Sequence, residues 1–129
     1  MNNEIEVIPS GTVTSPKGFQ AGTVSAGIKE SATDKLDLGI LFSEAPCTAA
    51  AVFTSNRIKA ASVILSQQRL QNGKAVAVVA NSGCANACVG EPGMADTIEM
   101  AELAAGKVGV SPDDVLVAST GVIGSRLPM

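Results

Sequence analysis

The sequence predicts an α/β fold in which helices pack on a layer of sheet. The run KAVAVVA at residues 74–80 is continuous and rich in β-branched residues, which is typical of a strand buried on both faces. Apolar residues recur at helical spacing between residues 94 and 108. Along the chain, strands come first, followed by a short helix, a strand, a longer helix and a last strand.

The first half of the chain is expected to supply three strands and one short helix. Residues 1–18 form a polar lead-in that ends in the turn-forming cluster Thr14–Gly18. We predict strands at Phe19–Ile28, Leu36–Ser43 and Ala49–Thr54, with a hairpin loop over Lys29–Lys35 between the first two. A short helix is predicted at Ser62–Leu70, whose glutamines mark its solvent side.

The second half starts from the strong turn signal Asn72-Gly73 and continues into the strand Lys74–Ala80. Asn81–Gly93, rich in Gly, Asn and small residues, is predicted to be a loop. The long helix should bury Met94, Ile98, Ala101, Ala105 and Val108, with Asp96, Glu99 and Glu102 on its solvent side. Gly109 should end this helix, Ser111 should cap a turn over residues 111–114, and Val115–Ser119 should be the last strand.

Composition narrows the class of protein. The 129 residues suit one domain spanning 1–129, and the 2% of aromatic residues requires a core of Ala, Val, Ile and Leu. The net charge is −3 and the basic residues are scattered, which argues against a nucleic-acid partner. The polar start and the short apolar runs predict no secretory signal and no membrane span, hence a cytoplasmic protein. The chain has no histidine for acid–base chemistry.

The three cysteines, Cys47, Cys84 and Cys88, form an odd set that suits a reducing compartment. Cys84 and Cys88 are four positions apart, a spacing that metal sites also use. With no histidine and one further cysteine, however, a four-ligand site is hard to assemble, so we expect no metal. The thiols are expected to be small buried apolar groups.

Two polar triplets follow predicted strands and are candidate functional segments. In Ser119-Thr120-Gly121, a hydroxyl and a backbone N–H on one side would bind a developing oxyanion, although an ordinary strand-ending turn also fits. Asn81-Ser82-Gly83 stands where α/β proteins place ligand sites, but Asn81 and Asn86 would also suit side-chain bonds to their own backbone. An anion-binding loop fits less well, because neither Gly-rich nucleotide pattern is present.

Four stretches together resemble one known family. TSPKGFQAGTVSAGIK, DLGILFSEAPCTAAAVFTSNRIKAA, AVVANSGCANACVGEPGMAD and VLVASTGVIGSRLPM are similar to the ornithine acetyltransferases, also called glutamate N-acetyltransferases, of arginine biosynthesis. The resemblance runs from about Thr14 to Met129. It implies a layered α/β fold of the self-processing, N-terminal-nucleophile-like type.

The resemblance also implies a reaction. A precursor would cut itself before a threonine, which then takes the acetyl group of N-acetylornithine and passes it to glutamate. The STGVIG motif implies that the Thr120 hydroxyl and the Gly121 N–H form the oxyanion hole. The partner would be a β-chain carrying the threonine, within a hetero-oligomer of α and β chains. No cofactor is implied, although acetyl-CoA stays open as a second acetyl donor.

Two departures from the family pattern matter. Cys84 stands where the family motif NSG-Asn-ANAC usually has an asparagine. The nucleophilic threonine of the family lies beyond the Leu-Pro-Met segment at residues 127–129. We therefore expect this chain to be an N-terminal portion of the α-chain, inactive without the later α-chain segment and the β-chain. An N-terminal-nucleophile amidase or peptidase subunit and a non-catalytic structural chain remain alternatives.

Overall fold

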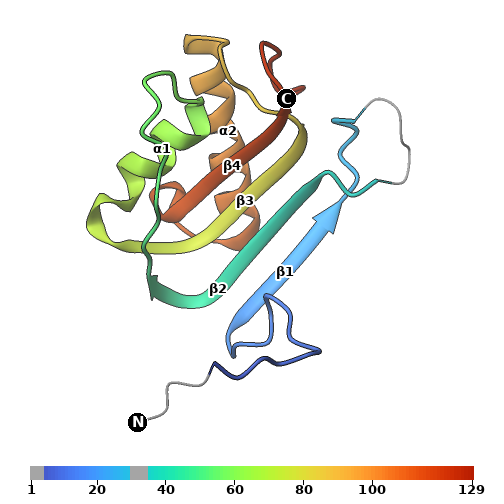
Figure 1. Ribbon diagram of the computed structural model, residues 1–129, viewed down its shortest axis with the longest axis vertical. Coiled ribbons are helices and arrows are strands. Elements are labelled where there is room, and N and C mark those ends of the chain that lie inside the picture. The colour runs from blue at the N-terminus through green and yellow to red at the C-terminus, as the bar shows by residue number, and fades with distance from the viewer. Residues whose placement is uncertain (1–4, 30–34) are drawn as a thin grey trace.

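The computed structural model describes residues 5–29 and 35–129, and within them the chain forms one sheet with two longer helices (Figure 1). The strands are β1 (Phe19–Val24), β2 (Leu38–Thr48), β3 (Lys74–Cys84) and β4 (Val115–Val122). The helices are α1 (Ala61–Arg69) and α2 (Glu91–Val108), with single 3₁₀ turns η1 (Leu70–Asn72) and η2 (Pro112–Asp114). In this part of the chain no helix is long and apolar enough to cross a membrane.

The strands lie side by side in the order β1-β2-β3-β4. The β1–β2 and β2–β3 pairs are antiparallel, whereas β3 and β4 are parallel and are joined by the crossover helix α2. Figure 1 shows α2 behind β3 and β4, while β1 and most of β2 extend beyond the helices. The predicted layered sheet-and-helix architecture is therefore confirmed.

The core lies where β3, β4 and α2 meet. Small side chains allow the helix to approach the sheet closely, as expected for a chain almost without aromatic residues. The buried apolar residues of this core are Leu65, Ala77, Val79, Cys84, Met100, Ala101, Ala105, Val115, Val117 and Leu127.

The buried face of α2 agrees with the prediction at Ala101 and Ala105, which lie in the core, and differs from it at other positions. Met94 and Ile98 are only half-buried, whereas Thr97 and Met100 face the core. Asp96, predicted on the solvent side, is buried and forms an ion pair with Arg126. Arg126 Nε donates to Asp96 Oδ2 at 3.0 Å, and its Nη2 donates to Oδ1. A pattern of apolar residues could not reveal this, because the partner comes from a segment 30 residues away.

The loop before α2 is fastened to the first turns of the helix by Asn86. Its Nδ2 donates to the Gly93 carbonyl at 2.7 Å and lies 2.9 Å from Thr97 Oγ1. The Thr97 hydroxyl in turn donates to the Gly93 carbonyl at 2.8 Å. This confirms the expectation that Asn86 bonds backbone, and it anchors the amino end of α2.

Helix α1 covers part of the outer edge of β4. The Ser66 hydroxyl accepts from the Val117 N–H at 2.9 Å and lies 2.8 Å from the Val117 carbonyl oxygen. Arg69 Nη1 donates to the Val115 carbonyl at 2.8 Å. The outward backbone groups of β4 are thereby satisfied near its start.

Several predicted strand boundaries are wrong. Ala49–Thr54 is not a strand: β2 instead continues through an irregularity between Phe42 and Cys47 to Thr48, and the chain then leaves the sheet with Val52 99% exposed. An apolar run does not become a strand when no neighbouring strand is available for pairing. The first strand ends at Val24 rather than Ile28, and the predicted hairpin loop lies mostly in residues 30–34, outside the described residues.

The predicted turn and cap signals are confirmed. Gly73 and Gly109 both adopt left-handed conformations, with φ of 68° and 75°, and each follows a helical segment. The Ser111 side chain accepts from the Asp113 N–H at the start of η2. These signals are local, so the sequence was sufficient to place them.

Candidate functional site

The two polar triplets predicted from the sequence meet at one place. Because β3 and β4 are parallel, their carboxyl ends lie at the same edge of the sheet. In the strand register Ser82 is opposite Thr120, and Gly83 is opposite Gly121. Ser82 and Gly83 were predicted to lie in a loop, but β3 continues through them to Cys84. The structure thus joins two segments that are almost 40 residues apart in sequence.

Gly83 and Gly121 permit an unusually close approach between the strands. The ladder is irregular here, since Cys84 is opposite both Thr120 and Val122. Gly121 has a φ of +134°, and a Cβ on it would overlap the Gly83 carbonyl and lie 2.6 Å from Cys84 N. Gly83 also has positive φ, at +111°. Only glycine suits position 121, because other residues rarely adopt this φ and because their Cβ atom would overlap β3.

A third segment packs against the same point. A Cβ on Gly83 would lie 2.8 Å from Lys29 Cγ. The buried Asp37 carboxylate holds this segment, accepting from Ala26 N–H at 2.6 Å and Lys29 N–H at 3.1 Å. The bond from Ala26 is the main cause that lowers the pKa of Asp37, against the opposing effect of desolvation. The Asp37 carbonyl also accepts from Ser82 N–H at 2.8 Å, which ties β2 to the site.

We call Thr120 and Gly121 the Thr-Gly step. Both residues are exposed at the end of β4. Among the described residues, the Thr120 hydroxyl has no side-chain or backbone partner. From the alternation of β4 we expect the Gly121 N–H to face the outer edge, like that of Val117, beyond the part that α1 covers. The Thr-Gly step thus offers an accessible hydroxyl and an accessible backbone N–H, the two donor types that stabilise an oxyanion.

Directly before the Thr-Gly step lie two polar side chains, of which Asn81 is buried and Ser119 is half-buried. Asn81 and Ser119 are opposite each other in the register, and Asn81 is 3% exposed. Asn81 Nδ2 donates to the Cys84 carbonyl at 2.8 Å, which confirms that this asparagine bonds its own strand. Asn81 Oδ1 and Ser119 Oγ are buried and have no partner among the described residues.

Cys84, which replaces the asparagine of the family motif, makes a hydrogen bond through its thiol. Its Sγ donates to the Ser125 carbonyl at 3.2 Å. Two backbone bonds strengthen the same connection, from Ala85 N–H to the Val122 carbonyl and from Gly124 N–H to the Ala87 carbonyl. The thiol therefore makes a polar contact here, and the segment after β4 is held against the loop after β3.

The cysteines are free thiols in different environments. Cys84 is buried, as expected, but Cys88 is exposed and Cys47 is half-buried, so the expectation of three buried thiols is wrong. Residues 5–29 and 35–129 contain no cluster of three or more Cys, Asp or Glu side chains suited to a metal ion.

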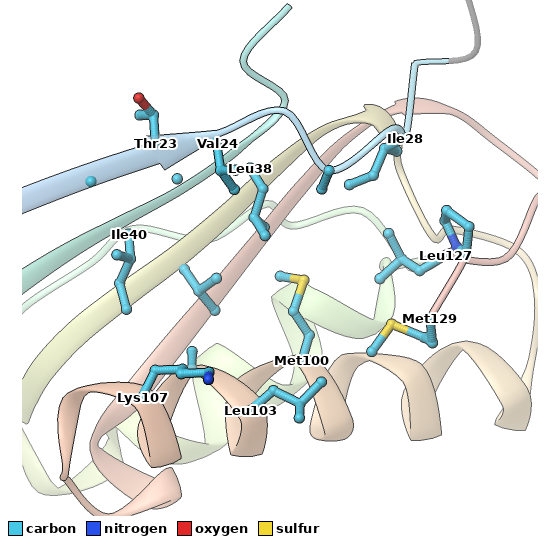
Figure 2. A pocket seen from close by; sticks show the side chains of 16 residues that line it. Thr23, Val24, Ile28, Leu38, Ile40, Met100, Leu103, Lys107, Leu127 and Met129 are labelled. Carbon is cyan, nitrogen blue, oxygen red and sulfur yellow. The ribbon is translucent and has the colours of Figure 1, made fainter. Parts of the chain in front are cut away.

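A separate groove lies between α2 and the β1–β2 half of the sheet (Figure 2). Its volume is about 550 Å³ and its walls are almost entirely apolar. Figure 2 shows Ile40 and Leu38 pointing from the sheet toward Met100 and Leu103 of the helix, with Leu127 nearby. The Thr-Gly step is not part of this groove.

Comparison with known proteins identifies the family. A family model described as the ArgJ family matches residues 20–129. The chain belongs to the ArgJ family. This ArgJ-family chain is 51% identical, over its whole length, to the arginine biosynthesis bifunctional protein ArgJ of Dehalococcoides mccartyi, of which it covers 32%. The predicted resemblance is confirmed.

Two solved structures are similar to this ArgJ-family chain. One is the arginine biosynthesis bifunctional protein ArgJ of Bacillus halodurans, with 41% identity and a TM-score of 0.86 over 92% of this chain and 61% of that one. The other is ornithine acetyltransferase from Mycobacterium tuberculosis complexed with ornithine, with 49% identity and a TM-score of 0.84 over 91% of this chain and 63% of that one. The chain thus spans about a third of its curated relative and three-fifths of the solved chains.

Sequence reasoning missed how Gly83 and the Asn81–Ser119 pair join the site. One signal was available. Asn81-Ser82-Gly83 and Ser119-Thr120-Gly121 are the same kind of triplet, each directly after a buried apolar strand. Aligning the two strands as a parallel pair would have placed the glycines opposite each other.

Proposed function

We propose that this chain is part of an acetyltransferase that moves the acetyl group of N-acetylornithine to glutamate in arginine biosynthesis. The Thr-Gly step is the oxyanion hole. The observation that carries this proposal is the accessible pair of donors at the end of β4, held there by the close contact of Gly83 and Gly121. Membership of the ArgJ family and the likeness to an ornithine acetyltransferase complexed with ornithine support it.

The proposed chemistry assigns separate roles to two chains. The hydroxyl of an N-terminal threonine on a β-chain attacks the acetyl carbonyl, and its own α-amino group takes the proton. The negative charge that develops on the carbonyl oxygen is stabilised by the Thr120 hydroxyl and the Gly121 N–H. On collapse the protonated α-amino group gives its proton to the leaving amine, which releases ornithine and leaves an acetyl-threonine ester. The amine of glutamate then attacks this ester through the same oxyanion hole. The α-amino group takes a proton from the attacking amine and passes it to the threonine oxygen as the ester bond breaks, giving N-acetylglutamate and the regenerated N-terminal threonine.

Chain lengths favour an assembly of more than one polypeptide. This chain fills 61% of the solved Bacillus halodurans chain but 32% of the curated Dehalococcoides mccartyi protein. A solved chain is accordingly about half as long as a curated relative, as cleavage into α and β chains would produce. We infer a hetero-oligomer of both chains. The three free thiols support a cytoplasmic location.

The test is Thr120→Ala in the complete protein. The variant removes one of two donors, so the rate of acetyl transfer from N-acetylornithine to glutamate should fall about a hundredfold or more. Thr120→Ser keeps the hydroxyl and should retain most of the activity. Thr48→Ala, at another exposed strand end, is the matched control and should be fully active. A fully active Thr120→Ala enzyme would disprove the role of this hydroxyl.

The same assay separates the alternatives. An amidase or peptidase would release its product to water at a rate independent of glutamate, whereas the proposed enzyme needs glutamate as the acceptor. Replacing N-acetylornithine by acetyl-CoA shows whether that donor is also used. If the assembled protein transfers no acetyl group to any acceptor, a structural role for this chain gains support.

A further inference from the structure

Two polar side chains directly before the Thr-Gly step, Asn81 and Ser119, each have a buried oxygen without a partner among the described residues. Two positions earlier along the strands, Val79 and Val117 occupy the same face and belong to the apolar core. Asn81 and Ser119 continue that face, yet Asn81 Oδ1 and Ser119 Oγ are buried without partners among the described residues. Burying an unpaired polar atom is unfavourable, and a valine or alanine would avoid it.

The amide nitrogen of Asn81 does have a partner, and this hydrogen bond lies next to the Thr-Gly step. Asn81 Nδ2 donates to the Cys84 carbonyl, three residues ahead on the same strand. The bond spans Ser82 and Gly83, where the ladder with β4 is irregular. It therefore fixes the backbone of Gly83 and Cys84, the two residues that Gly121 packs against.

We propose that Asn81 is a positioning residue for the oxyanion hole. Its amide holds the irregular end of β3, and that backbone sets the orientation of the peptide between Thr120 and Gly121. Asn81 is only 3% exposed, so in this proposal it acts through the backbone that it holds and does not touch the substrate. The effect of Asn81 on catalysis rests on the proposed function. The effect of Asn81 on the backbone at Gly121 does not depend on that function.

The first experiment is kinetic and uses the complete protein. In Asn81→Ala the Gly121 N–H is misaligned, so kcat should fall roughly ten- to a hundredfold, because small displacements of aligned groups have effects of this size. KM for N-acetylornithine should change little. The matched control is Asn86→Ala, which removes another buried asparagine amide and its two contacts. It should lower Tm and leave kcat of the folded enzyme unchanged.

The second experiment observes the geometry directly. Thr120-Gly121 is the sole Thr-Gly dipeptide in the 129 residues, so ¹³C-carbonyl threonine with ¹⁵N-glycine labels the Gly121 amide selectively. A signal from a Thr-Gly pair elsewhere in the complete protein is recognised because it persists in Thr120→Ser. We expect the Gly121 amide resonance to shift or broaden in Asn81→Ala and to keep its position in Asn86→Ala.

The outcomes are distinguishable. An unchanged Gly121 signal in Asn81→Ala overturns the inference, and so does a kcat equal to that of Asn86→Ala in an enzyme that Thr120→Ala inactivates. If the complete protein transfers no acetyl group, the proposed function fails, and the Gly121 signal still decides whether Asn81 positions the Thr-Gly step.

Discussion

Gly121 has a backbone conformation that residues with a side chain rarely adopt. The neighbouring backbone of Gly83 also leaves no room for a Cβ atom at this position. Gly121→Ala should therefore lower the free energy of unfolding by about 2–4 kcal/mol, combining left-handed strain with overlap on the Gly83 carbonyl. Urea denaturation of variant and parent measures this. Gly106→Ala is the control, because a Cβ there meets nothing and the position is helical. It should stabilise by roughly 1 kcal/mol, and equal effects of the two variants would contradict the close approach.

The Asp37 carboxylate makes the stability of the folded chain depend on pH. Its pKa is lowered in the folded chain, chiefly by the Ala26 N–H, from an ordinary value of 3.8. The ionised carboxylate therefore stabilises the fold fully at pH values above its ordinary pKa. This stabilisation is lost as the pH falls through the lower pKa of the folded state. Asp37→Asn should reduce Tm at pH 7, and the difference from the parent should shrink below about pH 4. A difference that stays constant down to about pH 2 would refute this role.

The candidate site could be predicted from sequence only one segment at a time. The Ser119–Gly121 and Asn81–Gly83 triplets were each identified from their place after an apolar strand, and the role of Thr120 in catalysis stays a prediction. What the residues could not show is that Gly83 is opposite Gly121. That fact depends on the strand register, and the register is fixed by packing between distant segments.

Helix α1 is attached to the sheet by the polar contact of Ser66 as well as by the buried side chain of Leu65. In Ser66→Ala the Val117 N–H and carbonyl would lose their partner in a buried place, at a cost of about 1–3 kcal/mol. The Val117 amide should also exchange its hydrogen faster. Gln67→Ala, at the exposed neighbouring position, should change stability by less than about 0.5 kcal/mol. Hydrogen exchange followed by NMR, with thermal melting, checks both variants. Unchanged protection of Val117 would show that Ser66 is dispensable.

Elements were predictable where local signals decide them. The helix ending at Gly109 and the turn at Gly73 follow from glycine conformations, and the strand at 74–80 follows from its β-branched run. Ala49–Thr54 has the same apolar character and is no strand, because strand formation needs a neighbour that the sequence does not reveal. Similarly, the polarity of Asp96 suggested solvent, while the partner Arg126 permits burial.

At the scale of the whole molecule, the apolar groove beside α2 is expected to be covered in the complete protein. The relatives are about three times as long as this chain, and Leu103 at the groove is 59% exposed. A dye that fluoresces on apolar surfaces should bind the 129-residue chain and be excluded from the complete protein. Leu103→Asp should be tolerated in the short chain and destabilise the complete one by about 2–3 kcal/mol. Equal tolerance in both would show that the groove stays open.

The partial cover of β4 by α1 has a consequence for solubility. An uncovered strand edge is a template on which another chain can add a strand, and long edges of this kind promote polymerisation. Here the helix blocks the edge at Val115 and Val117 and leaves it bare at Gly121. Extending the helix would remove the hazard but would also occupy the N–H assigned to the reaction. If the proposed oxyanion hole is correct, the edge at Gly121 must stay uncovered for the reaction, and the same uncovered edge leaves the chain open to strand addition by another molecule.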